Sequence, residues 1–275
     1  MSDPAAPAGR PLLLVGCGKM GGALLKGWRE RRIAESFVVV EPAPGVDLSG
    51  LAGVTLRAAP EALPADLDPA AVVLAVKPQS LDAVLPPYRR FATGGPVFLS
   101  IAAGKTLGYF ARRLGAAAPV VRAMPNTPAA IGRGIAVACA SAAVDAAAKA
   151  LCDRLLAAVG EVAWVEDEAL LDAVTAVSGS GPAYVFLLIE YLARAGIAAG
   201  LPEALAARLA LATVAGAGEL ARQSAESPAR LRENVTSPGG TTRAALDVLM
   251  ANDGLEPLLT RAVLAATRRS RELAD

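Results

Sequence analysis

A short apolar strand near the start of this chain runs directly into a turn with three spaced glycines. The strand is Pro11–Val15, the turn is Gly16-Cys17-Gly18-Lys19-Met20-Gly21, and a helical pattern follows over Met20–Arg32. G-x-G-x-x-G between a strand and a helix is typical of dinucleotide binding, because the glycines permit the tight turn, the approach of the pyrophosphate and close helix packing. The helix N-terminus adds free N–H groups for the phosphates. The alternative is an ordinary glycine-rich turn. We expect a cofactor site at Gly16, Gly18, Lys19, Met20 and Gly21.

The rest of the first half alternates short apolar runs with helical stretches. Several runs are apolar throughout, which is typical of strands buried on both faces. The predicted strands are Pro11–Val15, Phe37–Val40, Val54–Arg57, Ala71–Val76, Pro96–Ile101, Val120–Met124 and Gly134–Cys139, and the predicted helices are Met20–Arg32, Gln79–Phe91 and Thr106–Leu114. This order predicts a parallel sheet with crossover helices. The fold class is therefore α/β, with a Rossmann-type doubly wound sheet over residues 1–164.

Beyond Trp164 the pattern is helical to the end of the chain. The predicted helices are Glu168–Val177, Ala183–Ala199, Pro202–Gln223, Thr242–Met250 and Leu255–Leu273. We expect residues 165–275 to form a separate all-α domain. The helix at Ala183–Ala199 is apolar over most of its circumference, so it needs covering on more than one side. Dimerisation through this half would cover it. Glu190 and Arg194 near its middle argue against a membrane span.

The chain of 275 residues contains no histidine, which excludes several kinds of site. Ser-His-Asp and Cys-His pairs, an imidazole base and the usual zinc sites are all ruled out, and three scattered cysteines cannot form a Cys₄ site. We therefore expect no metal, and the cysteines read as buried small residues. With 27 Lys+Arg against 26 Asp+Glu, no basic face for nucleic acid is predicted. The segment Met1–Arg10 lacks the order of a signal peptide, so we expect a cytoplasmic protein.

Glu41 ends the second strand, at the point where a Rossmann fold places an acid to accept hydrogen bonds from the ribose hydroxyls of NAD. A carboxylate there repels the 2′-phosphate of NADP, and Pro42 and Ala43 supply no cation. The hypothesis is a preference for NADH over NADPH. The alternative is a solvated acid at a strand end.

Two further segments lie at the predicted carboxyl edge of the sheet, where open α/β sheets bind ligands. Ala75-Val76-Lys77-Pro78 ends one strand, and Lys77 is either a cofactor contact or a surface lysine before a proline-started helix. Arg122–Pro128 follows another strand. Asn126 there either presents its amide to a ligand or forms the turn.

The helical half contains two glycine-rich breaks. Ser178–Tyr184 ends one helix and starts another, and its glycines allow close approach of either a ligand or a packed helix. Glu233–Thr242 brings unpaired N–H groups to the start of the next helix, which makes a seat of carboxylate size. A plain capping loop is the alternative for this second break. The predicted seat consists of Gly239, Gly240, Thr241 and Thr242, with two hydroxyl groups beside it.

Taken in order, these blocks resemble pyrroline-5-carboxylate reductase over essentially the whole chain. The resemblance rests on the glycine fingerprint from Gly16, Ala75–Pro78, Arg122–Pro128, Ala176–Tyr184 and Asn234–Thr242. It implies reduction of the cyclic imine 1-pyrroline-5-carboxylate to L-proline by NADH or NADPH. It also implies a helical dimerisation half, with homodimers that can assemble into a decamer.

Carried over residue by residue, the resemblance assigns Gly16–Gly21, Ala75, Val76, Lys77 and Asn234 to the cofactor. It assigns Gly239–Thr242 to the substrate, with the backbone holding the carboxylate and the Thr242 hydroxyl meeting the ring nitrogen as the catalytic group. One acid among Glu166, Asp167 and Glu168 corresponds to another substrate contact, but the spacing does not say which. Glu41 departs from the small polar or basic residue of many members.

Two other functions fit the same architecture less well. A reductase of the 6-phosphogluconate type would rely on a lysine in a long interdomain helix, and Ala169–Leu211 contains none. A non-catalytic sensor of the NADH/NAD ratio would not need a carboxylate seat at Gly239–Thr242.

Overall fold

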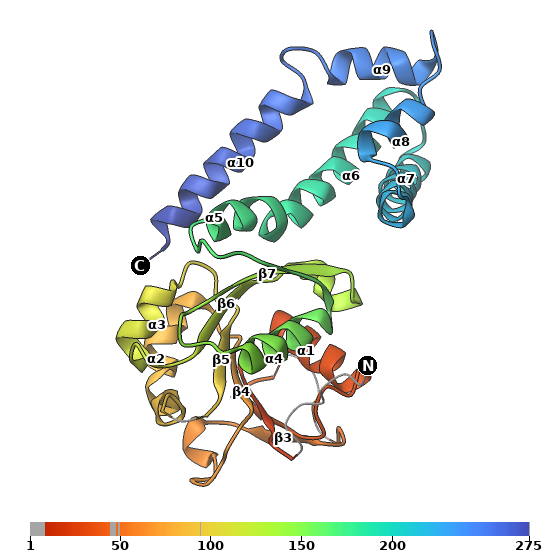
Figure 1. Ribbon diagram of the computed structural model, residues 1–275. Helices are drawn as coiled ribbons and strands as arrows, with labels where there is room; N and C mark the ends of the chain where they lie inside the picture. Colours follow the sequence, from red (N-terminus) through yellow and green to blue (C-terminus); the bar gives the residue numbers. More distant parts are fainter. Residues whose placement is uncertain (1–8, 45–47, 49, 94, 275) are drawn as a thin grey trace. The chain divides into compact units, whose positions relative to one another are not determined.

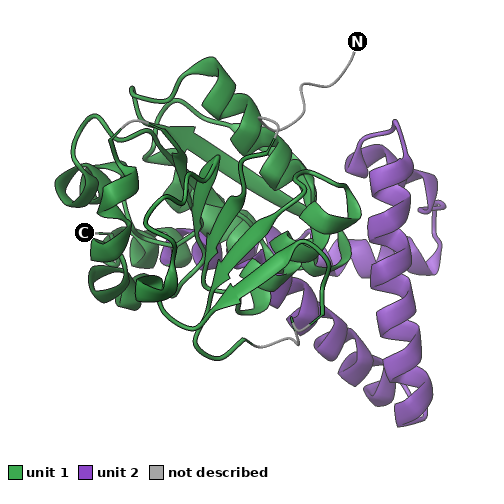
Figure 2. Ribbon diagram, turned by 90° about the horizontal axis from the view of Figure 1, so that it is seen from below, with its two compact units in different colours: residues 1–179, 266–275 green, residues 180–265 purple. Residues whose placement is uncertain are grey.

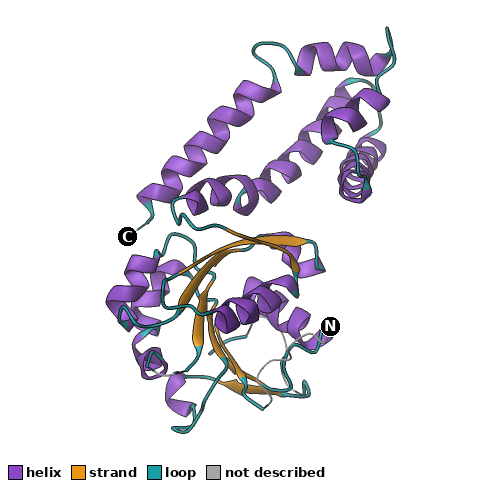
Figure 3. Cartoon of the chain, in the orientation of Figure 1, coloured by secondary structure: helices purple, strands orange, loops and turns teal. Residues whose placement is uncertain are grey.

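The computed structural model describes residues 9–44, 48, 50–93 and 95–274. The chain divides into two compact units (Figure 2): unit 1 comprises Met1–Gly179 with Ala266–Asp275, and unit 2 comprises Ser180–Ala265. The described strands all belong to unit 1, whereas unit 2 is helical (Figure 3). The last residues of the chain thus belong to the first unit. The expected functional boundary between residues 164 and 165 stays a prediction.

Unit 1 contains one sheet with the strand order β3-β2-β1-β4-β5-β6-β7-β8 (Figure 1). Its strands are β1 (Leu12–Val15), β2 (Phe37–Val40), β3 (Val54–Arg57), β4 (Ala71–Leu74), β5 (Val97–Ser100), β6 (Val120–Met124), β7 (Gly134–Ala140) and β8 (Gly160–Trp164). Neighbours pair in parallel except β6 and β7, which are antiparallel with Val121 opposite Ala140. The doubly wound α/β fold is confirmed, but β8 and the reversal at β7 were not expected.

Helices cover both faces of this sheet. Successive side chains of a strand point to opposite faces, so each strand contributes side chains to the apolar layer on either face. Leu12 and Leu14 of β1 pack in one apolar cluster, together with the helices α1 (Lys19–Glu30) and α4 (Ala146–Ala157). Leu13 and Val15 pack in the other cluster, with α2 (Leu81–Val84), η3 (Pro86–Phe91) and α3 (Leu107–Leu114). Burial on both faces explains why β1, β2 and β4 are apolar throughout.

The predicted single helix over Gln79–Phe91 is wrong. The segment consists of three short pieces, η2 (Pro78–Ser80), α2 and η3. Pro86 and Pro87 provide the reason, because proline lacks the N–H that an α-helix needs at an interior position. Three further elements were not predicted in unit 1, namely α4 and the short turns η1 (Pro60–Ala62) and η4 (Thr127–Ile131).

The helical region begins in unit 1 with α5 (Leu170–Val174), which continues into a π-helix, η5 (Thr175–Gly179). Unit 2 contains α6 (Gly181–Ala198), α7 (Glu203–Gln223), α8 (Pro228–Asn234) and α9 (Thr241–Leu249), followed by α10 (Leu255–Glu272), whose last turns belong to unit 1. Within unit 2, α6 and α7 pack closely. A Cβ added at Gly196 of α6 would lie 3.3 Å from the Cβ of Ala206 of α7, so glycine allows this approach.

Unit 2 leaves much apolar surface uncovered. No residue of α6 is buried, and Phe186 is 65% exposed. By length and composition, Leu170–Ala198 and Glu203–Gln223 are each apolar enough to cross a membrane, and few of their residues are buried within this chain. An apolar surface of this kind requires a covering partner, either protein or lipid.

Candidate active site

The glycine turn after β1 has the geometry that a dinucleotide site needs. Gly16 has φ +91°, and a Cβ there would lie 2.8 Å from the carbonyl oxygen of Ala75. A Cβ on Gly21 would collide with the carbonyl of Gly16, so this residue allows α1 to approach the turn. A Cβ on Gly18, in contrast, meets no protein atom within 4 Å. Gly16 and Gly21 therefore serve chain packing, whereas Gly18 faces open space.

Beside this turn lies a pocket of about 560 Å³ in unit 1. Among the predicted residues, Gly16, Gly18, Glu41, Ala75, Val76 and Lys77 line it. Lys19 and Met20 begin α1, where their backbone N–H groups stand at the helix N-terminus, but they do not line the pocket. The structure thus brings together the ends of β1, β2 and β4, as the edge of a doubly wound sheet requires.

Glu41 is tied to the glycine turn. Its Oε2 accepts a hydrogen bond from the backbone N–H of Cys17 at 2.8 Å, and its Oε1 accepts one from the N–H of Ala43 at 3.2 Å. Burial, and then the charge of Glu41, raises the pKa of the Cys17 thiol. Glu41 is therefore more than a solvated acid at a strand end, because it orders the turn that lines the pocket.

Several pocket residues were missed by sequence reasoning. Ala58, Ala59, Pro60 and Glu61 follow the end of β3, and Ser80, Val84 and Tyr88 come from the segment after Lys77. For Ala58 and Ala59, their place just beyond the end of β3 was the signal that could have identified them. The hydroxyl of Tyr88 is buried and finds no hydrogen-bond partner among the described residues, and burial raises its pKa, with the Glu61 charge adding to the effect.

The pocket can hold a dinucleotide although few of its lining residues are cations. Gly18 leaves room for a pyrophosphate next to the backbone, and the α1 N-terminus supplies N–H donors. Among the lining residues, Glu41 and Glu61 are acids and Lys77 is a cation. The phosphates would therefore be held chiefly by the backbone.

The predicted carboxylate seat lies in unit 2, at the start of α9. Gly239 has φ +68°, Gly240 is the N-cap, and Thr241 and Thr242 are the first two residues of the helix. The side chain of Ser237 lies against Gly240, because a Cβ at Gly240 would collide with the Oγ of Ser237. No side chain caps this helix, so the N–H groups of its first turn are available to an anion. The N–H of Gly240, which was expected to be unpaired, instead donates to the carbonyl of Ser237 at 3.1 Å.

Asn234, predicted as a cofactor contact, ends α8. Its Nδ2 donates to Oε2 of Glu226 at 2.9 Å within unit 2. The side-chain oxygen of Asn234 is not part of that bond. Its predicted role stays a prediction.

The three candidate acids after β8 differ in their contacts. Oε1 of Glu168 accepts from Arg122 Nη1 at 2.9 Å and from the backbone N–H of Leu107 at 2.7 Å. Asp167 accepts from the N–H of Ala169 at 2.9 Å. Glu166 is exposed. Glu168 therefore links β6, the N-terminus of α3 and the start of α5, so its contacts are structural.

The roles of two loops were left open by the sequence. Oδ1 of Asn126 accepts from the backbone N–H of Ile135 in β7 at 2.9 Å, so this side chain ties its loop to the neighbouring strand, and its role toward a ligand stays a prediction. A Cβ on Gly179 would clash with the terminal methyl of Met124, which can rotate away, so this contact does not require glycine. The free thiols of Cys17, Cys139 and Cys152 are buried, as expected, and burial raises the pKa of Cys152 to about 12.

Comparison with known proteins agrees with this geometry. The chain is 40% identical over 268 residues to the pyrroline-5-carboxylate reductase of Pseudomonas aeruginosa, covering 96% of this chain and 97% of that one. The chain belongs to the pyrroline-5-carboxylate reductase family. A family model described as pyrroline-5-carboxylate reductase dimerisation matches residues 168–273.

Solved structures of the family share the fold along nearly the whole chain. The pyrroline-5-carboxylate reductase of Coxiella burnetii superposes with a TM-score of 0.88 at 33% identity, covering 96% of this chain and 98% of that one. The Plasmodium falciparum pyrroline carboxylate reductase, solved with NADP bound, gives a TM-score of 0.80 at 29% identity, with coverage of 96% and 100%. The resemblance seen in the sequence motifs is thereby confirmed.

Proposed function

We propose that this chain reduces 1-pyrroline-5-carboxylate to L-proline, the final step of proline biosynthesis, with NADH or NADPH as the reductant. The observation that carries the proposal is the 40% identity to a reductase of that name over 96% of the chain. The reduced nicotinamide supplies a hydride to the C=N carbon, and one proton on nitrogen completes the amine. The imine nitrogen is basic enough to be protonated near neutral pH, which agrees with a chain that contains no histidine.

The residues of unit 2 are proposed to bind and orient the substrate. The backbone N–H groups at Gly239 and Thr241 would hold its carboxylate at the start of α9, whereas the N–H of Gly240 already donates to the carbonyl of Ser237. The hydroxyl of Thr242 would meet the ring nitrogen and direct the imine carbon toward the hydride donor. Orientation of this kind supplies much of the rate enhancement in a reaction that needs no strong acid.

The cofactor is proposed to lie in the 560 Å³ pocket, in contact with Gly16, Gly18, Ala75, Val76 and Lys77. Glu41 and Glu61 place two carboxylates on the pocket wall. Both would repel a 2′-phosphate, so we propose that NADH is preferred over NADPH. The NADP-bound relative shows that the family's fold also accepts the phosphorylated cofactor.

The exposed apolar helices of unit 2 are proposed to form a homodimer. The dimerisation family model covers these residues, and a second copy would bury side chains such as Phe186 and Tyr191. The Arg194–Glu190 ion pair on α6 favours this arrangement over a membrane, because charged groups are costly in lipid. We further propose a cytoplasmic location and assembly of dimers into a decamer.

The test is incubation of the purified protein with 1-pyrroline-5-carboxylate and each cofactor, with the loss of reduced nicotinamide followed over time. Turnover with both and a higher kcat/KM with NADH is the expected result. Absence of turnover with either cofactor would contradict the activity, whereas higher efficiency with NADPH would contradict only the preference.

A further inference from the structure

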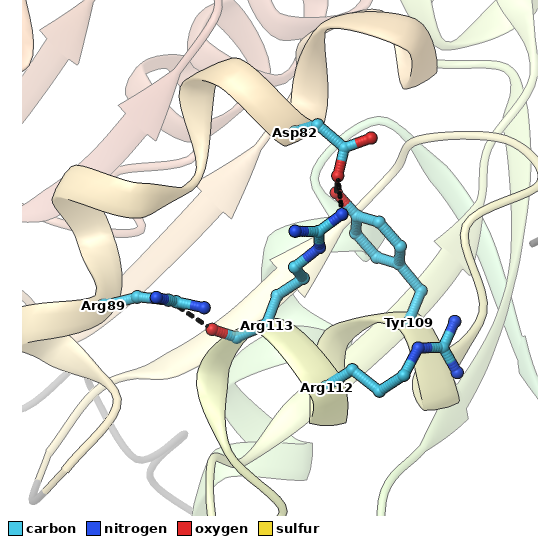
Figure 4. A pocket seen from close by; sticks show the side chains of 5 residues that line it. All are labelled: Asp82, Arg89, Tyr109, Arg112 and Arg113. Carbon is cyan, nitrogen blue, oxygen red and sulfur yellow. Dashed lines mark hydrogen bonds and ion pairs between the residues drawn. The ribbon is translucent and has the colours of Figure 1, made fainter.

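A second pocket of unit 1 lies on the sheet face covered by α2, η3 and α3. It has a volume of about 480 Å³ and is lined by Asp82, Arg89, Tyr109, Arg112 and Arg113 (Figure 4). All five are polar side chains, with three guanidinium groups against one carboxylate. Lys105 adds another positive charge nearby, since its Nζ lies 4.7 Å from the centre of the Tyr109 ring. We name this group of five residues the arginine pocket.

The one carboxylate of the arginine pocket is already occupied. Asp82 accepts a hydrogen bond from the Tyr109 hydroxyl at 3.1 Å and forms an ion pair with Arg113 (Figure 4). The guanidinium of Arg113 also lies 5.6 Å from the centre of the Tyr109 ring. Asp82 therefore neutralises and positions Arg113, and among the described residues no other acid lines the pocket.

The two remaining guanidinium groups keep most of their donors for other partners. Arg89 uses Nε to donate to the backbone carbonyl of Arg113, which leaves its terminal nitrogens outside that bond. Arg112 forms no hydrogen bond or ion pair with the part of the chain that the structure describes. Each guanidinium offers a planar fork of N–H donors that matches an oxyanion.

Compensation of the helix dipole explains only part of this arrangement. Arg112 and Arg113 lie in the last turn of α3, where cations are favoured. Arg89 comes from η3, a separate element, and yet lines the same pocket. Cations converging from two elements repel one another, which an anion between them would relieve.

We propose that the arginine pocket binds a phosphate-type oxyanion, either inorganic or carried by a small metabolite. This site is separate from the proposed dinucleotide pocket, because the two share no lining residue. The segment from residue 81 to residue 91 contributes to both, with Asp82 and Arg89 in one pocket and Val84 and Tyr88 in the other. An anion at Arg89 therefore contacts the same short segment that lines the dinucleotide pocket.

The test is calorimetric titration of inorganic pyrophosphate into the full-length protein saturated with NADH, so that the dinucleotide pocket is filled. We expect one site per chain, with affinity that falls as salt is raised. The double variant Arg89→Gln/Arg112→Gln should weaken binding at least tenfold, whereas Arg31→Gln, an exposed arginine at the end of α1, should not change it.

A parallel titration with AMP separates the two sources of the anion. Tighter binding of AMP than of pyrophosphate would assign the site to a phosphorylated metabolite, and the reverse would assign it to an inorganic anion. Thermal unfolding of the double variant checks that it is folded. No heat of binding in the NADH-saturated protein, or equal affinity in the folded double variant, would overturn the proposal.

Discussion

The carboxylate of Glu41 accepts a hydrogen bond from the backbone N–H of Cys17 at 2.8 Å. An acid at the end of β2 thus fixes the middle of the glycine turn that follows β1. Charge and hydrogen bonding at Glu41 can be separated by substitution, because a glutamine keeps an oxygen acceptor but removes the charge.

Glu41→Gln is expected to shift cofactor use toward NADPH. Removing one carboxylate from the wall of the proposed cofactor pocket should raise the kcat/KM ratio of NADPH to NADH about tenfold, equivalent to roughly 1.4 kcal/mol. Steady-state kinetics with both cofactors measure this ratio. Glu41→Ala, which also removes the acceptor for Cys17, should lower efficiency with both. An unchanged ratio in Glu41→Gln would show that this charge does not select the cofactor.

Glu61→Gln tests the acid that sequence reasoning missed. Because Glu61 is exposed and more strongly screened by solvent, we expect a smaller shift of the same sign, about threefold by the same kinetic ratio. Glu35→Gln, an acid in the loop before β2 that does not line the pocket, is the matched control and should leave the ratio unchanged. A shift toward NADH in Glu61→Gln would contradict repulsion by the pocket wall.

Gly18→Ala and Gly16→Ala are expected to affect different properties: the first cofactor affinity, and the second the stability of the fold. Gly18 has ordinary backbone angles and its Cβ would point into open space, so alanine should weaken NADH binding at least tenfold without lowering the melting temperature. Gly16 has φ +91° and a crowded Cβ position, so alanine there should destabilise the fold by more than about 1 kcal/mol. Cofactor titration and thermal unfolding distinguish the two. A destabilised Gly18→Ala with normal affinity would refute the pyrophosphate assignment.

Thr242→Ala is expected to lower kcat/KM for the imine by roughly 10²-fold, the size of a general-acid contribution. Thr242→Ser, which retains the hydroxyl, should recover most of the loss. Thr260→Ala on α10 is the control, because its hydroxyl only donates back to the carbonyl of Glu256. Nearly normal kinetics in Thr242→Ala would remove this residue from the mechanism.

Glu168→Gln is expected to lower stability. It removes the charge that pairs with Arg122, whose side chain is only 7% exposed, and leaving a buried guanidinium without its counter-charge costs on the order of 3 kcal/mol. Thermal unfolding should show the loss, and the double variant Arg122→Met/Glu168→Gln should recover part of it. If Glu168→Gln melts normally but loses substrate affinity, the residue belongs to the site after all.

The parallel order of the strands could be predicted because the apolar runs coincide with strands buried on both faces. β8 escaped detection because Gly160–Trp164 alternates between partly buried and exposed positions and does not form an apolar run like those of β1, β2 and β4. α4 could have been found from Asp145, whose side chain caps the helix by accepting from the N–H of Ala148 at 2.7 Å. This capping signal is local to Asp145. The helix was nevertheless not predicted, because its alanine-rich sequence has only a weak apolar stripe.

The site was predictable where backbone conformation dictates residue type. Gly16, Gly21 and Gly239 each occupy positions that a side chain would strain or block. Glu61 and Tyr88 were not predictable, because nothing near them in the sequence specifies that they face a pocket. Helical periodicity likewise marks α10 as a helix but does not say with which unit its last turns pack.

The end of the chain returns to unit 1. Ser270 donates to Asp172 at 2.7 Å, and Gly104 lies against Leu273. Unit 2 is consequently inserted within unit 1, and unit 1 lacks part of its packing until the residues that follow Ala265 have been synthesised. Synthesis of unit 1 therefore starts before that of unit 2, but unit 1 gains its remaining packing contacts only after unit 2 has been made.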